Sequence, residues 1–525
     1  MAEEQLTETA DVVGRGWPAH RLPLVVACLI SAAAIGWRLV DVTEWPYPAD
    51  NTVQYESALA ARAIWVAASP AARTPEREAW YRAVGFYHVV SPPVLPALVV
   101  ACYLISGEEI PWVSKVFTAL FWAAAGWLML AALVRQGVSR WAAVAAMTYL
   151  TFTPFGQLVA RSFQTESVVV FAFAAAVLCL ARPGRGLGWR ETVTVGLACG
   201  LAAAVKPGTL QLPLAAGFAA WAMTATGSAG RKFAATGLFI SLLLLPSAIY
   251  ALVRLGDRGG MIRPHLLADA AFYRAVADMI RRTVGYPALT VGLIGAVLAA
   301  RAGYPLTAGL FVGYAGYVAT FTYHCSTHPY YHTPLMVPVA LGVGWAAQAL
   351  IHVVRRMAEV SARAVGVRDW AARARWLVAA VMLAALARYV YTTRTPWAGP
   401  WRWTANNRAG LAAAHEKEAN LTELVSEIAA TMRPGGRAVA LTSDYGYAYE
   451  YWTNTRVLLW PRTTEPGPSG RPAAARLDSA IAAGFDYFAV YDLPEYAAQP
   501  DLQAALVRRG RLVLERPDLL LFKLR

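Results

Sequence analysis

Residues 113–134 read VSKVFTALFWAAAGWLMLAALV, and this stretch decides the fold class. Lys115 is its only charged side chain. An α-helix rises about 1.5 Å per residue, so about 20 apolar residues cross the hydrocarbon core of a membrane. The stretch therefore predicts a membrane-spanning helix.

Similar apolar runs recur along most of the chain and predict eleven spans in all. The other ten are 22–40, 141–160, 164–182, 191–206, 208–226, 233–254, 285–301, 304–323, 333–354 and 376–392. The run 94–106 is shorter and follows two prolines, so we expect an interfacial or re-entrant helix there. Apolar residues make up 57% of the 525-residue chain and charged residues 15%. This composition excludes a disordered chain, a coiled coil and a typical cytosolic enzyme.

The basic residues predict an orientation for these spans. The net charge is +14, and Lys and Arg concentrate in every second short loop, which is typical of cytoplasmic loops. We therefore place the N-terminus in the cytoplasm and treat the first span as a retained anchor. The loop 255–284 is an exception, because its five arginines fall on the outer side, and we interpret it as a longer segment along the membrane surface. This distribution explains the positive net charge by topology, so we expect no nucleic-acid partner.

The chain is predicted to have three parts. Residues 1–21 form a cytoplasmic segment, and residues 22–392 form the membrane domain with a first outer loop at 41–112. Residues 393–525 read as an α/β domain outside the membrane. Its predicted strands are 437–443, 456–460, 485–491 and 519–524, and its predicted helices are 408–432, 473–483 and 496–507.

Polar residues gather at the predicted outer face, where ionisable groups are costly unless paired or hydrated. They are Asp50, Glu56, Arg62, His88, Arg161, Gln164, Glu166, Lys206, His324, His328, Tyr330, Tyr331 and His332. Carboxylates, isolated cations and hydroxyl or imidazole donors suit a site that holds an anionic phosphate and removes a proton from a nucleophile. The set is therefore a candidate functional site.

Five of these outer blocks resemble motifs of the GT-C glycosyltransferases. They are YPADNTVQYESALAARAI at 47–64, HVVSPPVLP at 88–96, the Thr153-Pro154…Arg161…Glu166 stretch, GLAAAVKP at 200–207 and HPYYHTPLMVP at 328–338. In particular they resemble the dolichyl-phosphate-mannose protein mannosyltransferase and aminoarabinose-transferase group, glycosyltransferase family 39. The blocks occur in order over residues 22–350.

The resemblance implies a polytopic helical membrane protein that transfers a sugar from a polyprenyl phosphate to an acceptor hydroxyl. Donor, membrane lipids and a protein, lipid or glycan acceptor would be its partners. The reaction would invert the sugar at the outer face, with Asp50 or Glu56 as base. The family often has Asp-Glu where this chain has Asp50-Asn51, so one acid is missing.

The remaining candidates take the roles that this chemistry needs. Arg161 and Lys206 would bind the donor phosphate. The other substrate-binding candidates are His88, Gln164, Glu166, His324, His328, Tyr330, Tyr331 and His332. No cofactor is certain. The three histidines spaced by four residues leave a divalent metal open, although Pro329 and Pro334 interrupt a continuous helix.

Other interpretations stay open for these residues. Asp50 would also serve as a helix cap, Glu56 as a partner of Arg62, and Arg161 and Lys206 as interfacial anchors. A transporter or flippase for a lipid-linked sugar would also use outer cations and aromatic residues, and a non-catalytic scaffold is a third reading. Neither rival needs a carboxylate base.

Overall fold

The computed structural model describes most of the chain as two compact units. The described residues are 21–40, 42–43, 45–46, 51–89, 91–181, 188–253, 263–365, 423–424, 427–428, 430–432, 436–442, 445–463 and 471–525. Unit 1 comprises residues 1–40, 118–160 and 166–402, and unit 2 comprises residues 41–117, 161–165 and 403–525. Asp50, the predicted span 376–392 and most of the predicted helix 408–432 lie outside the described residues.

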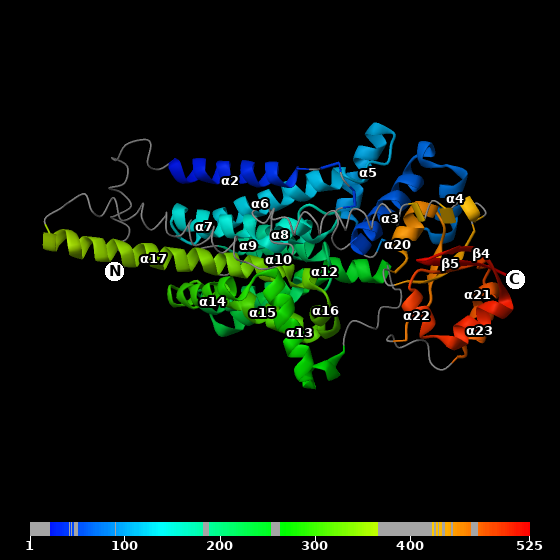
Figure 1. Cartoon of the computed structure of the whole chain (residues 1–525). Helices are drawn as coiled ribbons and strands as arrows, with labels where there is room; N and C mark the ends of the chain where they lie inside the picture. The colour runs from blue at the N-terminus through cyan, green and yellow to red at the C-terminus, as the bar shows by residue number, and fades with distance from the viewer. Residues whose placement is uncertain are drawn as a thin grey trace. The chain divides into compact units, whose positions relative to one another are not determined.

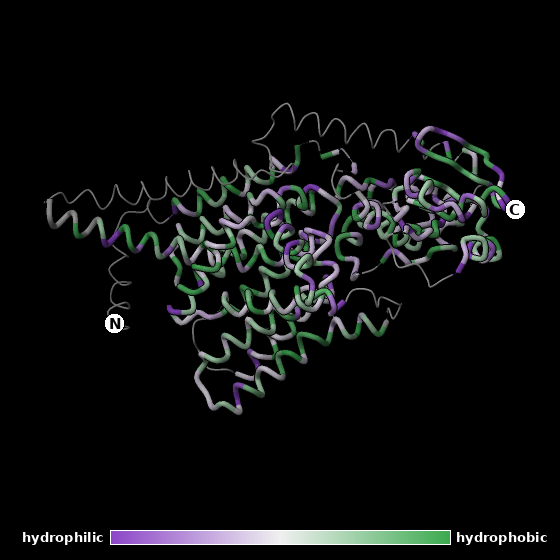
Figure 2. Tube along the Cα trace, turned by 60° about the horizontal axis from the view of Figure 1, so that its bottom comes forward, coloured by the Kyte–Doolittle hydropathy of each residue, from purple (hydrophilic) through white to green (hydrophobic). Residues whose placement is uncertain are grey.

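Unit 1 is a bundle of helices, as the apolar runs predict (Figure 1). Its elements are α2 (Leu22–Arg38), α7 (Arg140–Phe152), α8 (Pro154–Val159), α9 (Glu166–Leu180), α10 (Trp189–Ala204), α11 (Gln211–Thr224), α12 (Ala229–Val253), η3 (Pro264–Ala268), α13 (Ala270–Thr283), α14 (Tyr286–Arg301), α15 (Leu306–Thr320), α16 (Thr322–Thr327), η4 (Pro329–Leu335) and α17 (Met336–Val365). Helix α6 (Val113–Arg135) has its first residues in unit 2. Figure 2 shows apolar residues predominating along the bundle helices.

The helices agree with the predicted spans in position more than in length. Within the described residues, three helices are long and apolar enough to cross a membrane: Val113–Arg135, Ala229–Leu252 and Pro329–Met357. The count rises to four if α13 and α14, bent by 90°, are taken as one span. The predicted number of eleven is therefore not confirmed. The run 141–160 is divided at Pro154, because proline cannot donate the backbone hydrogen bond that a helix interior needs.

Glycines allow several bundle helices to approach closely. A Cβ on Gly295 of α14 would lie 1.8 Å from the Gly342 carbonyl oxygen of α17, and one on Gly342 would lie 2.0 Å from the Gly292 carbonyl oxygen. In α15, a Cβ on Gly313 would lie 2.3 Å from the Leu212 carbonyl oxygen of α11. Small residues at such contacts are typical of helix packing in membranes.

Unit 2 contains the first loop and the C-terminal α/β domain. Its elements are α3 (Asn51–Ala68), η2 (Pro70–Ala72), α4 (Pro75–Val84), α5 (Val94–Ser106), β1 (Ala438–Leu441), α20 (Tyr447–Thr453), β2 (Val457–Leu459), α21 (Ala473–Ala482), β3 (Tyr487–Val490), α22 (Leu493–Ala497), α23 (Pro500–Arg509), β4 (Gly510–Arg516) and β5 (Leu519–Leu524). The strand order is β2-β1-β3-β5-β4, with β1 parallel to β2 and β3, and β5 antiparallel to β3 and β4. The four predicted strands are present, and β4 was missed.

The central strands of the sheet are buried on both faces. One apolar cluster joins Phe488 of β3 to Leu477 of α21 and Leu506 of α23. The other joins Ala489 of β3 to Tyr449 of α20. The short strands β1 and β3 are fully buried, as central strands covered by helices should be.

Candidate functional site

The predicted residues of unit 1 gather around Lys206. The Lys206 ammonium lies 2.5 Å from Glu166 Oε1 and faces the rings of Tyr330 and Tyr331, whose centroids are 5.1 and 4.7 Å away. Glu166 begins α9 and is buried, and its Oε2 has no hydrogen-bond partner among the described residues. Its carboxylate is favoured at the positive end of the helix dipole. The arrangement is a partly buried cation with one carboxylate and an aromatic wall.

A short turn holds Lys206 in this position. Thr209 Oγ1 donates to the Lys206 carbonyl oxygen at 2.7 Å, and the Gly208 amide donates to Gln211 Oε1 at 2.9 Å. Gly208 has a φ of +95°, a conformation that other residues rarely adopt. A Cβ there would also lie 2.8 Å from the Phe321 ring. The Lys-Pro-Gly motif therefore forms a defined turn rather than a flexible loop.

His324 and His328 extend this cluster. Their ring centroids are 6.3 Å apart, and the His324 ring meets Tyr331 edge-on at 4.7 Å. Burial, with smaller contributions from the nearby His328, Lys206 and Arg263, lowers the pKa of His324 to about 4. Burial followed by the Lys206 charge also lowers the pKa of His328. Both imidazoles are therefore neutral at pH 7 and offer donors and acceptors rather than positive charge.

The His332 ring differs from the rings of His324 and His328 in its hydrogen bonds. It is buried, its Nδ1 bonds the Tyr314 hydroxyl, and its Nε2 bonds the Cys325 carbonyl oxygen at 2.7 Å. Both ring nitrogens are thus engaged within unit 1. The predicted contact of His332 with substrate stays a prediction.

Sequence reasoning missed Arg263 as a member of the cluster. Its guanidinium carbon lies 4.1 Å from the Tyr323 ring centroid. Its amide donates to Thr322 Oγ1 at 3.2 Å, and Thr322 Oγ1 donates back to its carbonyl oxygen at 2.9 Å. Arg263 is one of the five arginines of the loop 255–284, which lie on the predicted outer side although basic residues concentrate in cytoplasmic loops. This exception in the sequence could have indicated a functional role for Arg263.

In unit 2, helix α3 carries Glu56 and contacts the segment that carries Arg161 and Gln164. The Phe163 amide donates to Gln54 Oε1 at 3.4 Å, half a turn before Glu56. Arg161 is 8% exposed and Gln164 is fully buried. Neither polar atom of the Gln164 side chain has a hydrogen-bond partner in the described part of the chain. Unit 2 therefore brings Gln54, Arg161 and Gln164 into one neighbourhood.

His88 pairs with a residue of the C-terminal domain that the sequence did not indicate. Its Nε2 lies 2.8 Å from Glu450 Oε1 of α20, and the Trp80 indole donates to the same oxygen at 2.8 Å. All three side chains are buried. The neighbouring Tyr447 hydroxyl has a raised pKa, mainly because it is buried and next because the Glu56 carboxylate lies nearby, with a smaller contribution from Glu450.

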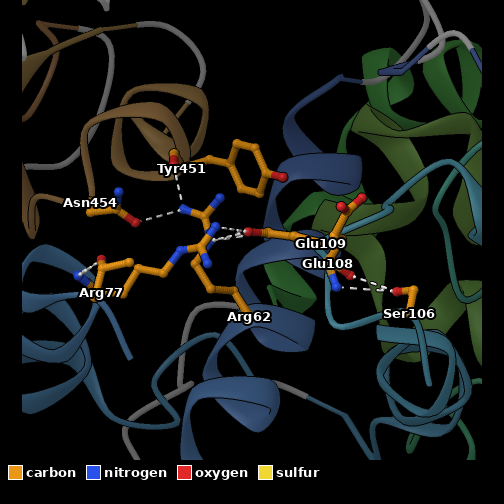
Figure 3. A network of polar contacts seen from close by, with 8 residues as sticks. Arg62, Arg77, Ser106, Glu108, Glu109, Tyr451 and Asn454 are labelled. Carbon is orange, nitrogen blue, oxygen red and sulfur yellow. Dashed lines mark hydrogen bonds and ion pairs between the residues drawn. The ribbon is translucent and has the colours of Figure 1, made fainter. Parts of the chain in front are cut away.

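Arg62 joins the same two segments through a second network (Figure 3). Its Nε lies 3.0 Å from Glu109 Oε1, and Arg77 reaches Glu109 Oε2 at 2.8 Å. Arg62 also donates to the Tyr451 carbonyl oxygen and, at 3.0 Å, to Asn454 Oδ1. Burial alone would lower the pKa of Arg62, but Glu109 and Tyr451 outweigh it and raise the pKa. The sequence left a pair between Glu56 and Arg62 open, and the structure pairs Arg62 with Glu109.

These contacts show how α20 is fixed on the first loop. Trp452 of α20 donates to the Tyr55 hydroxyl at 2.9 Å, and Arg456 donates to the Ala83 carbonyl oxygen at 3.2 Å. Together with Arg62 and Glu450, they form a buried and partly buried polar contact between residues 447–456 and residues 55–109. We call this set of contacts the α20 latch.

The metal possibility receives no support from the described residues. No group of three or more His, Cys, Asp or Glu side chains among them is placed to hold a metal ion. The three spaced histidines do not share one helix, since α16 ends at Thr327 and η4 begins at Pro329. Proline at that point interrupts the helix.

The fold is similar to that of solved structures along almost the whole chain. ArnT from Cupriavidus metallidurans bound to undecaprenyl phosphate matches with a TM-score of 0.51 and 14% identity, over 95% of this chain and 97% of that one. Its apo form matches equally, with 98% of each chain covered.

A second kind of enzyme has a comparable fold. The apo oligosaccharyltransferase of Archaeoglobus fulgidus matches with a TM-score of 0.51 and 13% identity, over 94% of this chain and 73% of that one. No protein-family model and no curated protein matches the sequence. At these identities the likeness concerns the fold alone, and it agrees with the predicted mainly helical chain that carries a C-terminal α/β domain.

Proposed function

We propose that the chain is a membrane glycosyltransferase that moves a sugar from a polyprenyl-phosphate donor to an acceptor hydroxyl. The observation that carries the proposal is the Lys206 cluster, set in a fold shared with an enzyme solved with undecaprenyl phosphate. A partly buried ammonium that faces two tyrosine rings, with the His324 and His328 imidazoles beside Tyr331, suits a phosphate ester. The aromatic residues offer apolar surface to a sugar or an isoprenyl chain.

The proposed reaction is an inverting displacement. The acceptor oxygen attacks the anomeric carbon, its proton passes to a first-loop carboxylate, and the bond between the anomeric carbon and the phosphate oxygen breaks. Polyprenyl phosphate leaves with the bonding electrons. We assign the base to Asp50 or Glu56, and a positioned base contributes about 10²–10⁴-fold.

The remaining roles follow from charge and hydrogen-bonding capacity. Lys206 and Arg161 stabilise the charge that develops on the departing phosphate. Glu166 holds the Lys206 ammonium in place at 2.5 Å. His324, His328, Tyr330 and Tyr331 contact the donor, and His88, Gln164 and His332 remain substrate-binding candidates from the sequence.

The proposed topology completes this assignment. The N-terminus is cytoplasmic, the membrane domain spans 22–392, and the domain 393–525 is extracytoplasmic. Its support is the concentration of Lys and Arg in alternate short loops. The reaction would then occur at the outer face.

Transfer assays with purified membranes test this proposal against transport. Labelled polyprenyl-phosphate sugars are supplied, and the acceptor fraction that gains label is identified. At least one of the variants Asp50→Asn and Glu56→Gln should lower turnover a hundred-fold or more, while donor binding persists. Movement of labelled donor across the membrane without transfer to any acceptor would favour a flippase instead. Full transfer in both variants would remove the base assignment.

A further inference from the structure

Helix α13 (Ala270–Thr283) has three chemically distinct faces. At 100° per residue, Phe272, Val276 and Thr283 share one face, and all three are buried. Tyr273 and Ala277 lie on the next face, where Tyr273 is 55% exposed. The third face carries charge, from Arg274, Asp278, Arg281 and Arg282. A helix of a soluble bundle needs only two faces, one buried and one polar.

The first face fastens α13 to unit 1. It contacts α16 and η4, and Thr283 Oγ1 donates to the Pro329 carbonyl oxygen at 3.0 Å. The Tyr286 hydroxyl donates to the Ala277 carbonyl oxygen at 3.1 Å, which ties α13 to the start of α14. These contacts hold the first face of α13 against unit 1 and leave Tyr273 and Arg274 exposed.

The direction of α13 indicates what those faces meet. Its axis makes an angle of 90° with α14, and Figure 1 shows it crossing the run of the bundle helices. Helix α14 is apolar and exposes Leu293, Ile294 and Val297, as a helix in contact with lipid does. With α14 taken as a membrane span, a helix perpendicular to it at its end would lie in the plane of the membrane surface.

The charged face carries a surplus of positive charge. Asp278 pairs with Arg281 at 2.5 Å and with Arg282 at 2.6 Å. One carboxylate therefore serves two guanidinium groups, and Arg274 adds a third. The arginines are exposed and lie beside the face that carries Tyr273.

We propose that α13 is an interfacial helix that binds anionic phospholipid headgroups of the bilayer. Tyr273 and Ala277 enter the interface, and Arg274, Arg281 and Arg282 attract the headgroups. The bilayer is the occupant rather than the sugar donor, because the arginine face is turned away from the face that packs on α16 and η4. The Lys206 cluster lies on the side of α16 and η4.

Two adjacent positions test the geometry in the full chain. Tyr273→Cys and Arg274→Cys are spin-labelled in nanodiscs, in a background where the exposed Cys28 is changed by Cys28→Ser. The label at 273 should collide preferentially with oxygen, which partitions into lipid, and the label at 274 with a water-soluble nickel reagent. Equal access of both labels to the nickel reagent would overturn the proposal.

Lipid enrichment tests the charge. In nanodiscs with 30 mol% phosphatidylglycerol, the fraction retained by the protein is measured for Arg274→Gln/Arg281→Gln. Each arginine should contribute about five-fold, so retention should fall at least five-fold. Arg274→Lys/Arg281→Lys should restore it, and the exposed pair Arg508→Gln/Arg511→Gln serves as control. Unchanged retention, an equal loss in the control, or a loss confined to the apparent KM for the sugar donor would each refute headgroup binding.

Discussion

Replacing Arg62 by methionine should loosen the α20 latch without emptying the space that its side chain fills. Arg62→Met keeps an unbranched stem but removes the ion pair with Glu109 and the hydrogen bonds to the Tyr451 carbonyl and Asn454. Loss of one partner of a buried pair costs about 3–5 kcal/mol when the other charge is orphaned. Here Glu109 keeps Arg77 at 2.8 Å, which reduces that cost.

The buried acceptors determine the remaining loss. Each buried polar group left without a partner costs about 1–3 kcal/mol. We therefore expect the free energy of opening the α20 latch to fall by about 3 kcal/mol. This raises the population of the open state about a hundred-fold. The matched control is Arg77→Met, whose side chain is 23% exposed and leaves Arg62–Glu109 intact. We expect about 1 kcal/mol or less for it.

Hydrogen exchange of the full chain measures the difference directly. Amides of α20 should exchange about a hundred-fold faster in Arg62→Met, and at most about five-fold faster in Arg77→Met. The exchange rates of amides in α14, in unit 1, should be unchanged, which would show that the chain is folded. A rise of less than three-fold in α20, or an equal rise in both variants, would refute the reasoning.

Three further outcomes are expected. Lys206→Met should lower kcat/KM for sugar transfer about 10²–10³-fold, with partial rescue by Lys206→Arg, and undiminished transfer would contradict the phosphate assignment. Gly295→Ala should cost about 1–3 kcal/mol by overpacking, since its Cβ would meet the Gly342 carbonyl oxygen at 1.8 Å; thermal unfolding should show this, while Gly237→Ala, with open space around it, should not. Because burial and then its charged neighbours depress the pKa of His324 to about 4, stability should be full above pH 6.5 and decline as the pH falls toward 4; His324→Gln should flatten that decline in pH-dependent unfolding, and parallel curves would argue against it.

Local sequence patterns predicted most of the helices and strands. Long apolar runs identify helices because burial in lipid leaves the backbone no other way to satisfy its hydrogen bonds. The number of membrane spans cannot be derived from the apolar runs in the same way. Several apolar helices, such as Leu22–Arg38 and Leu306–Thr320, are shorter than a membrane span. Strand β4 was missed because GRLVLER interleaves charged residues and directly follows α23.

Candidate residues in short motifs were easier to predict than their partners. Lys206, Tyr330 and Tyr331 stand out because they occur in compact turns between apolar runs, and the structure places them together. Glu109 and Glu450 carry no such signal. Glu450 meets His88 across 362 residues, and a pairing of that separation leaves no pattern in the local sequence.

The α20 latch has a consequence for the order in which the protein matures during synthesis. Arg62 is made long before the residue whose carbonyl it binds, Tyr451, with a separation of 389 residues. At about 5–20 residues per second, the ribosome leaves this arginine waiting for about 20–80 s. Until then Arg62, Trp80 and His88 lack their C-terminal hydrogen-bond partners, so the first loop cannot complete its buried polar contacts before α20 has been synthesised. A chain truncated before Tyr447 would never leave that state.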